Sequence, residues 1–343
     1  MADANAHHEP FLGMAPEDEK FVKSLGLKMA VASLSQPLTV SRVLIQLGYE
    51  PFPLSTGKTL IVAGRNAYFL PNAFSYIRQL SNARGLSILW TGVDATIASI
   101  AVQGLASHHT EKYINEYYPN IGGPAENVDK EEDALTDHES GRRMLRAAIR
   151  DSVVRVVAIT VSRPFTVVMI RSIAQIIGKE TKYTDVFSSL KLIGNQEGPG
   201  GLFSGLAPQI VGELLVLWGV HTLTYLATRA LIRSEAADKT PRDENAVKAA
   251  ENVRNFIKTA VPFVVNSFGY PYSVVSSVMA VAGSGLAVSF LPYSPSFVTW
   301  HNAWDYLRPT GLKRGARLFL REQVGAVTVG ADQQLYASNS YFA

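Results

Sequence analysis

The chain has 343 residues, of which 47% are hydrophobic and 18% are charged, against about 25% charged residues in a typical soluble domain. Its 32 basic and 29 acidic residues leave a net charge of +3 and form no long basic block, which argues against nucleic acid as a partner. The sequence contains no cysteine, so disulfides, thiolate metal sites and a cysteine nucleophile are excluded.

We expect residues 1–24 to form a polar tail. Residues 1–20 hold five acids, no arginine and no long apolar stretch. This pattern is neither a secretory signal nor an arginine-rich amphipathic transit peptide. We therefore expect internal targeting signals, which suit the mitochondrial outer membrane among other destinations.

Five stretches are long and apolar enough to be membrane spans, since crossing a bilayer takes roughly 20 residues. Their approximate limits are 25–47, 93–113, 152–177, 206–232 and 256–281. A charge inside a membrane costs from about 3 kcal/mol upward, so the polar residues in these stretches should face protein or water. These residues are Arg42, Asp94, Arg155, Arg163, Arg171, Glu213, His221 and Asn266. The alternative is a soluble protein with buried helices.

Two polar connections divide the chain into three blocks. The acidic loop, residues 119–143, includes a stretch from 120 to 140 with seven acids and one lysine, which is typical of a solvated segment. The second connection, residues 234–253, mixes charges with Pro241, and we expect it to become helical from Glu244 onward. The three blocks are residues 25–118, 144–233 and 254–343.

A proline motif recurs in each block, and such repeats determine the fold. It is Gln-Pro-Leu-Thr-Val, Arg-Pro-Phe-Thr-Val and Tyr-Pro-Tyr-Ser-Val around Pro37, Pro164 and Pro271, which are 127 and 107 residues apart. A second motif follows at 89–92 (Leu-Trp-Thr-Gly), 202–205 (Leu-Phe-Ser-Gly) and 318–321 (Leu-Phe-Leu-Arg). Both motifs predict three copies of one structural unit.

Each proline lies inside an otherwise helical apolar span. Proline removes a backbone donor and clashes with the preceding turn, so we expect a kink in the first helix of each repeat. Glycine-rich stretches at 194–205 and 311–315 predict tight turns into a following helix. The predicted unit is therefore a pair of membrane helices with a short surface helix between them.

This threefold unit resembles the mitochondrial carrier superfamily. In that superfamily an acid lies two residues after the proline and a base lies five residues after it, and these side chains pair to close one gate. Here the acid positions hold Thr39, Thr166 and Ser273, and the base positions hold Arg42, Met169 and Ser276. A gate without its charges cannot close through ion pairs, so we expect no conventional solute exchange.

The third repeat departs further from the superfamily, because only 24 residues follow Phe319. They include Arg321, Glu322 and Asp332, which leave no apolar run long enough to span a bilayer. We therefore predict an all-α membrane protein with a carrier-like three-repeat helical bundle. It has five transmembrane helices, and the missing sixth helix leaves one side of the bundle open.

Several segments narrow the resemblance to the mitochondrial carrier homologs, a non-transporting branch of the superfamily. They are 35–38 (Ser-Gln-Pro-Leu), 48–51 (Gly-Tyr-Glu-Pro), 202–206 (Leu-Phe-Ser-Gly-Leu) and 292–295 (Pro-Tyr-Ser-Pro). The resemblance implies a multi-pass protein of the mitochondrial outer membrane. It also implies insertion of α-helical proteins, such as tail-anchored proteins, through a polar groove open to lipid, and docking of a pro-apoptotic BH3 protein. Lipid scrambling through the same groove is a further hypothesis.

An insertase needs a polar, wet groove within the membrane, and its partners are the lipid bilayer and the hydrophobic helices of client proteins. Arg42 occupies the one gate base that survives, and Tyr270 precedes the third proline. The candidate groove-lining residues are Arg42, Arg155, Glu213 and Tyr270, with Arg171 and His221 behind them. The alternative for these residues is a structural role, which for Arg42 and Glu213 is an intramembrane ion pair.

No constellation of residues indicates catalysis, a metal or a cofactor. The pairs His7-His8 and His108-His109 are adjacent rather than at the spacing of metal ligands on a helix. No nucleophile, base and orienting acid form a recognisable arrangement. We therefore predict a protein that is not an enzyme and has no cofactor. A solute carrier and a receptor for a BH3-type helix are the alternative functions.

Overall fold

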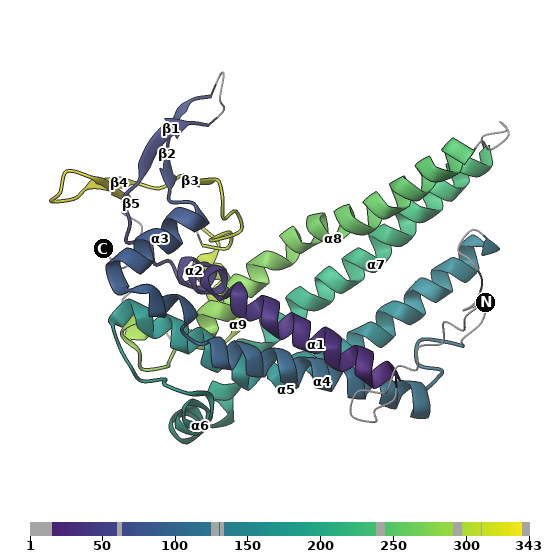
Figure 1. Cartoon of the computed structure of the whole chain (residues 1–343), viewed down its shortest axis with the longest axis horizontal. Coiled ribbons are helices and arrows are strands. Elements are labelled where there is room, and N and C mark those ends of the chain that lie inside the picture. The colour runs from purple at the N-terminus through teal and green to yellow at the C-terminus, as the bar shows by residue number, and fades with distance from the viewer. Residues whose placement is uncertain are drawn as a thin grey trace, which may run out of the picture.

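The protein is mostly helical and repeats one helical unit, as a computed structural model of the chain shows (Figure 1). The structure describes residues 16–59, 64–124, 130, 134–237, 244–290, 297–309 and 311–337. The first repeat consists of α1 (Pro16–Leu34), α2 (Gln36–Gln46), the surface helix α3 (Ala73–Arg84), the 3₁₀ turn η2 (Leu86–Trp90) and α4 (Val93–Tyr117). Pro37 lies in the first turn of α2, so the predicted kink is a break between α1 and α2 at Ser35.

The second repeat consists of α5 (Asp137–Gly178), α6 (Val186–Leu202) and α7 (Leu206–Ala237). α5 begins at Asp137, because Thr136 and Glu139 cap it reciprocally. The Thr136 amide donates to Glu139 Oε2 at 2.9 Å, and the Glu139 amide donates to Thr136 Oγ1 at 3.3 Å. The helix therefore starts within the predicted acidic loop, and most of the loop's other acids lie outside the described residues. Pro164 lies inside α5 without ending it.

The third repeat is shorter than the other two. It consists of α8 (Glu244–Val281), the 3₁₀ turn η4 (Ala287–Phe290) and the short helix α9 (Trp300–Leu307). α8 begins at Glu244, as the sequence predicted, and contains Pro271 in its interior. Among the described residues after Leu307 the structure has turns and the strands given below, and no helix.

The two glycine-rich stretches behave differently from each other. Residues 311–315 form a turn, as predicted, with Gly315 at a φ of 74°, but among the described residues β3 follows it rather than the predicted helix. Residues 194–202 are helical and belong to α6, and the predicted turn into a following helix is confined to residues 203–205, with Gly205 at a φ of 69° before α7. Gly198, at a φ of 66°, is the one residue of α6 that departs from helical geometry, and glycine tolerates this backbone conformation.

Five short strands among the described residues were not predicted. They are β1 (Ser55–Lys58), β2 (Asn66–Leu70), β3 (Arg321–Gln323), β4 (Val327–Val329) and β5 (Leu335–Ala337). β2 pairs antiparallel with both β1 and β3, and β4 pairs with β5 in a separate hairpin. These strands tie the C-terminal segment to the first repeat. Arg321 also forms an ion pair with Glu50 and donates to the Pro71 carbonyl at 2.9 Å.

The five long helices form an arc that is open on one side. α1 packs on α4, α4 on α5, α5 on α7, and α7 on α8. No comparable packing joins α8 to α1 within the described ranges. Figure 1 shows α1 and the α7–α8 pair diverging from the end that holds α2. The open side lies where a sixth helix would complete the ring, as the sequence predicted.

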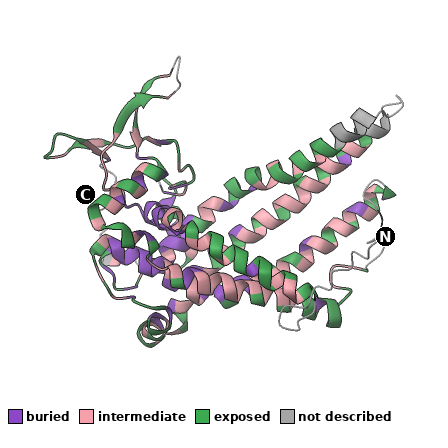
Figure 2. Cartoon of the chain, in the orientation of Figure 1, coloured by how far each residue is buried: buried purple, intermediate pink, exposed green. Residues whose placement is uncertain are grey.

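The two ends of the arc differ in packing. At one end, which we name the closed end, α2 meets α5 and α8, and Val40, Leu44, Val167 and Val274 are fully buried. The other end, which we name the open end, holds the start of α1 and the α4–α5 connection, and Figure 2 shows few buried residues there. β5 lies at the closed end (Figure 1), so the chain between the α4–α5 connection and β5 passes from one end to the other.

Three helical segments are long and apolar enough to cross a membrane, namely η2 with α4, then α5 and α7. Only 6% of the most apolar stretch of α7 and 39% of that of α5 is buried in the protein. The rest of these surfaces must contact lipid or another molecule. α1 and α8 have 19 and 38 residues, but neither contains, among its described residues, a stretch apolar enough to cross a membrane. Their role as membrane spans stays a prediction.

Candidate functional site

Two of the predicted groove residues, Arg155 and Glu213, lie together on neighbouring helices. Arg155 on α5 and Glu213 on α7 form an ion pair, with 3.8 Å between Arg155 Nε and Glu213 Oε2. Their side chains are 46% and 43% exposed. The pair therefore joins two helices that are apolar enough to span a membrane, yet both of its charges are open to surrounding molecules.

A second pair lies between the same two helices. His221 Nε2 on α7 is 2.9 Å from Asp151 Oδ2 on α5. Nearby, the Trp218 indole nitrogen donates to Ser152 Oγ at 3.0 Å. Asp151, Arg155, Glu213 and His221 thus form one polar region between α5 and α7, which we name the polar seam.

The polar seam lies on the face of α5 opposite an exposed apolar stripe. Residues two positions apart on an α-helix point in directions about 200° apart. Val153 and Val157, two residues after Asp151 and Arg155, are exposed apolar residues. Leu145 and Val161 extend this apolar stripe along α5 in steps of about one or two turns. An apolar stripe of this kind suits contact with lipid, and we infer from it that the opposite face of α5, with the polar seam, points toward the inside of the arc.

The geometry of the polar seam makes it a tolerable place for charge within a membrane. Two unit charges about 4 Å apart attract by roughly 4 kcal/mol at an effective dielectric near 20 and by only about 1 kcal/mol in water. Each charge of the Arg155–Glu213 pair is compensated, and each side chain still has free surface for a water molecule or a polar group of another molecule.

The closed end is held by a different kind of polar contact, centred on Arg163. This fully buried side chain donates through Nε to the Ser204 carbonyl at 2.8 Å, and through Nη1 to Gln209 Oε1 at 2.5 Å. Its Nη2 also reaches the Ser276 carbonyl of α8 at 3.3 Å. In return Ser276 Oγ donates to the Gly205 carbonyl at 2.9 Å. One guanidinium thus joins α5, the α6–α7 turn and α8.

Arg171, a predicted groove residue, lies in this closed end and is also fully buried. Its guanidinium forms an ion pair with Glu197 of α6, with Nη2 and Oε2 2.8 Å apart. It also donates through Nε to the Ala280 carbonyl at 2.8 Å and through Nη1 to the Tyr183 hydroxyl at 3.3 Å. Its contacts are those of a residue that fixes α5 to α6 and α8.

Tyr270 and Arg42 lie where α8 approaches α2. The Tyr270 hydroxyl donates to the Arg314 carbonyl at 2.6 Å and accepts from Gln46 Nε2 at 3.2 Å. Arg42, one turn before Gln46 on α2, has an exposed side chain and forms no ion pair with any described residue. The six predicted residues therefore divide into Arg155, Glu213 and His221 in the polar seam, Arg171 and Tyr270 in the closed end, and Arg42 beside Tyr270.

The sequence missed two charged partners. Asp151, the partner of His221, lies one residue before the predicted start of the third span. Glu197, the partner of Arg171, falls in the stretch that was predicted to be a turn. Asp151 could have been found from its spacing, because it lies four residues before Arg155 and therefore on the same face of the helix.

The described residues contain no group of three or more histidine, aspartate or glutamate side chains that could hold a metal ion. The charged groups of the polar seam instead lie in pairs.

The chain is similar to known proteins over most of its length. The profile of the family described as mitochondrial carrier protein matches residues 144–235. The human protein mitochondrial carrier homolog 2 is 33% identical over 293 residues, which cover 84% of this chain and 90% of that relative. Mouse mitochondrial carrier homolog 1 is 30% identical over 315 residues, covering 90% of this chain and 77% of that relative.

Proposed function

Because the chain belongs to the mitochondrial carrier homolog family, we propose that it inserts α-helical proteins, tail-anchored proteins among them, into the mitochondrial outer membrane. The observation that supports this proposal is the polar seam, which lies half exposed between two helices of an arc with one open side. A client's apolar helix contacts lipid through the open side, while its hydrophilic tail passes along the seam.

The energetic advantage comes from the tail. An unpaired polar group costs several kcal/mol in hydrocarbon, and a charge costs more. Arg155, Glu213, Asp151 and His221 offer a passing tail both donors and acceptors within the depth of α5 and α7. The protein thereby lowers the barrier without a fuel molecule. A lipid headgroup is also a polar group, so lipid scrambling follows from the same argument.

A solute carrier of the alternating-access type fits the geometry less well. Such a carrier must open both ends in turn, and the contacts that close one end must break each cycle. Here Arg163 and Arg171 hold the closed end through bonds to backbone carbonyls and to Glu197 on several elements. Neither arginine is free to exchange partners while the helices keep this packing.

The test is reconstitution of the purified protein into liposomes. Insertion of a tail-anchored client, movement of a fluorescent phospholipid between leaflets, and counter-exchange of carboxylates and nucleotides are measured side by side. We expect client insertion above protein-free liposomes and no saturable exchange. A variant with both charges of the pair removed, Arg155→Leu with Glu213→Leu, should insert less, while Arg317→Leu on the exposed surface serves as its control. Saturable exchange, or insertion no better than in empty liposomes, contradicts the proposal.

A further inference from the structure

α1 and α2 follow each other in the chain but are held very differently. Of the 19 residues of α1, all of them described, only Leu25 is buried, whereas most residues of α2 are buried. α2 packs on α3, α5 and α8, while α1 packs substantially only on α4 and on α2 itself within the described ranges. α2 is therefore part of the closed end, and α1 is an arm that projects from it.

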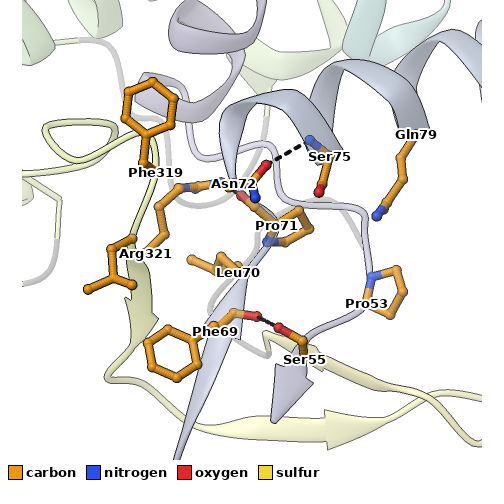
Figure 3. Close-up of a pocket in the computed structure, with 11 residues that line it drawn as sticks. Pro53, Ser55, Phe69, Leu70, Pro71, Asn72, Ser75, Gln79, Phe319 and Arg321 are labelled. Atoms are coloured by element: carbon orange, nitrogen blue, oxygen red, sulfur yellow. Dashed lines mark hydrogen bonds between the residues drawn. The ribbon is translucent and has the colours of Figure 1, made fainter. Parts of the chain in front are cut away.

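The base of this arm is anchored through α3 and the C-terminal segment. Asn72 caps α3, because its Oδ1 accepts from the Ser75 amide at 2.8 Å. Arg321 donates to the Pro71 carbonyl at 2.9 Å, and Figure 3 shows Arg321 beside the turn that carries Pro71 and Asn72. Because α2 packs on α3, these contacts help to hold α2 in place.

The junction between α1 and α2 has the features of a hinge. Ser35 lies between the two helices, with a φ of −88° and a ψ of 4°. Pro37, in the first turn of α2, has no amide hydrogen and so cannot continue the backbone hydrogen bonds of α1 into α2. The Leu38 and Thr39 amides both donate to the Ser35 carbonyl, at 3.0 and 3.2 Å. A change in the backbone dihedrals of Ser35 therefore redirects α1 while α2 keeps its packing.

A polar contact holds the far end of α1 on α4. Asp18 Oδ1 lies 2.9 Å from His108 Nε2, and Asp18 also forms an ion pair with Lys112. The Phe21 ring stacks on the His108 imidazole, with 4.1 Å between the ring centroids and 8° between the planes. We name Asp18, Phe21, His108 and Lys112 the α1 latch.

The α1 latch is weak, because it lies near the surface. The side chains of Asp18 and Lys112 are 34% and 48% exposed, and ion pairs in such positions stabilise little. Ser35 lies 17 residues after Asp18, which at about 1.5 Å per residue of an α-helix places the latch about 25 Å from the hinge. A small rotation at Ser35 therefore moves the latched end of α1 over a long distance.

α1 and α8 border the open side of the arc, and both carry exposed apolar surface. On α1 this surface lies on the face opposite the buried Leu25, since these residues follow Leu25 by two, six and nine positions. The exposed residues are Leu27, Val31 and Leu34 on α1, and Phe256, Phe263 and Phe268 on α8. A movement of α1 from α4 toward α8 would bring the two surfaces closer and narrow the open side.

We propose that α1 is a gate for the open side. It leaves α4 when the α1 latch opens, turns about Ser35 and swings toward α8. The latched position, which the structure shows, keeps the open side wide, and the swung position covers it. The gate follows from the packing of the helices and does not depend on the insertase proposal.

Spin-label distances in the full-length protein in lipid nanodiscs test the gate. Nitroxides at Lys20→Cys and Lys258→Cys report the distance from α1 to α8, and nitroxides at Glu111→Cys and Lys258→Cys report that from α4 to α8; the chain has no other cysteine. Asp18→Asn removes the charge of the latch and keeps the size of the side chain. We expect the population at shorter α1–α8 distances to grow about fivefold relative to the latched one, the factor that corresponds to about 1 kcal/mol for an exposed ion pair.

Glu17→Gln is the matched control, since it removes one negative charge from the neighbouring, exposed residue. Its α1–α8 distances should match those of the parent chain, and the α4–α8 distances should be the same in every variant. Unchanged α1–α8 distances in Asp18→Asn, or a shift to longer ones, would overturn the proposal. Equal shifts of the α1–α8 and α4–α8 distances would overturn it as well, because the whole arc would then move.

Discussion

The closed end and the polar seam solve the same problem, charge among apolar helices, in opposite ways. At the closed end Arg163 and Arg171 are buried, and their donors reach backbone carbonyls and the Glu197 carboxylate. In the polar seam Arg155 and Glu213 pair once, at 3.8 Å, and stay about half exposed. Buried arginines fix helices to one another, whereas exposed pairs leave polar surface for other molecules.

This contrast explains how one scaffold is rigid at one end and open along one side. Chain elements from the second and third repeats meet around Arg163, and the C-terminal segment closes the same end through Arg321. The open end has polar ties of its own: α5 is joined to α7 through Arg229 Nε and Asp137 Oδ1 at 2.7 Å, and α1 to α4 through Asp18 Oδ1 and His108 Nε2 at 2.9 Å. No arginine is fully buried there among the described residues, and α1 packs substantially only on α4 and α2.

The largest expected loss of stability comes from a substitution at the closed end. Arg171→Met leaves Glu197 and the Ala280 carbonyl without their partner, and breaking a buried ion pair in this way costs about 3–5 kcal/mol. We expect the free energy of unfolding in detergent, measured by chemical denaturation, to fall by that amount. Arg317→Met, on the exposed surface, is the control and should stay within about 0.5 kcal/mol of the parent chain. A loss as small as the control's would mean that Arg171 does not fix the closed end.

Two glycines sharpen the comparison. Gly205 has a φ of +69°, and an added Cβ would lie 2.5 Å from the Ser276 carbonyl oxygen, so Gly205→Ala should destabilise by about 2–5 kcal/mol. Gly104 is helical, and an added Cβ would lie 2.7 Å from the end of the Leu25 side chain, which can rotate away. Gly104→Ala should therefore change stability by less than about 1 kcal/mol. Thermal unfolding of the two variants, measured under one condition, checks this difference in stability. Similar losses of stability in both variants would contradict the proposed difference in packing between the two ends.

A smaller effect is expected from charge reversal in the polar seam. Arg155→Glu puts two carboxylates opposite each other, and Glu213→Arg puts two guanidiniums together, at a site where screening reduces each penalty to about 1 kcal/mol. Each single reversal should lower client insertion per folded protein, and the double reversal should restore it. The alternative to a groove role for Arg42 and Glu213 was an ion pair between them, and the structure pairs Glu213 with Arg155 instead. Double reversal of Arg42 and Glu213 should accordingly fail to restore insertion.

The smallest effect concerns pH. Hydrogen bonds from Lys112 and then His108 hold the pKa of Asp18 below 3.8, so this contact between α1 and α4 stabilises above that pH and is lost as pH falls through the lowered pKa. Glu50 responds to pH in the opposite direction, because burial raises the pKa of its carboxyl above 4.5. The stability that Glu50 contributes is therefore present below pH 4.5 and is lost as pH rises through the raised pKa.

Acid should therefore loosen α1 from α4 before it affects the closed end. Spin labels at Lys20→Cys and Glu111→Cys report the first distance, and labels at Arg78→Cys and Lys313→Cys report the second; the chain has no other cysteine. We expect the first distance distribution to broaden below pH 3.8 while the second is unchanged. Broadening of both together would contradict the assignment.

The features that were predicted from the sequence are local or periodic. The three prolines and the helix from Glu244 follow from motifs and composition within short windows. The division of the predicted groove residues between the polar seam and the closed end depends instead on contacts between residues that are far apart in the sequence. Which acid meets Arg155 depends on how α5 and α7 are aligned along their lengths, and a single sequence does not contain that alignment.

The strands were missed for a different reason. β1 is Ser-Thr-Gly-Lys with every residue exposed, so it lacks the alternation of apolar and polar residues that indicates a strand. Its pairing with β2, and that of β2 with residues 321–323, depends on the C-terminal segment returning to the first repeat. Arg321 was visible only as a charge that interrupts a would-be sixth helix, although it holds that segment in place.

The central claim is that water reaches the inside of the arc within the membrane, and thiol accessibility tests it most directly. Single cysteines are placed at Ala147, one turn before Asp151 on the face of α5 that carries the polar seam, and at Val153 on the opposite, apolar face of the same helix. The protein is reconstituted into liposomes and treated with a charged, membrane-impermeant maleimide. The account predicts fast modification of Ala147→Cys and little or none of Val153→Cys. Equal rates at the two positions, or protection of Ala147→Cys, would contradict it.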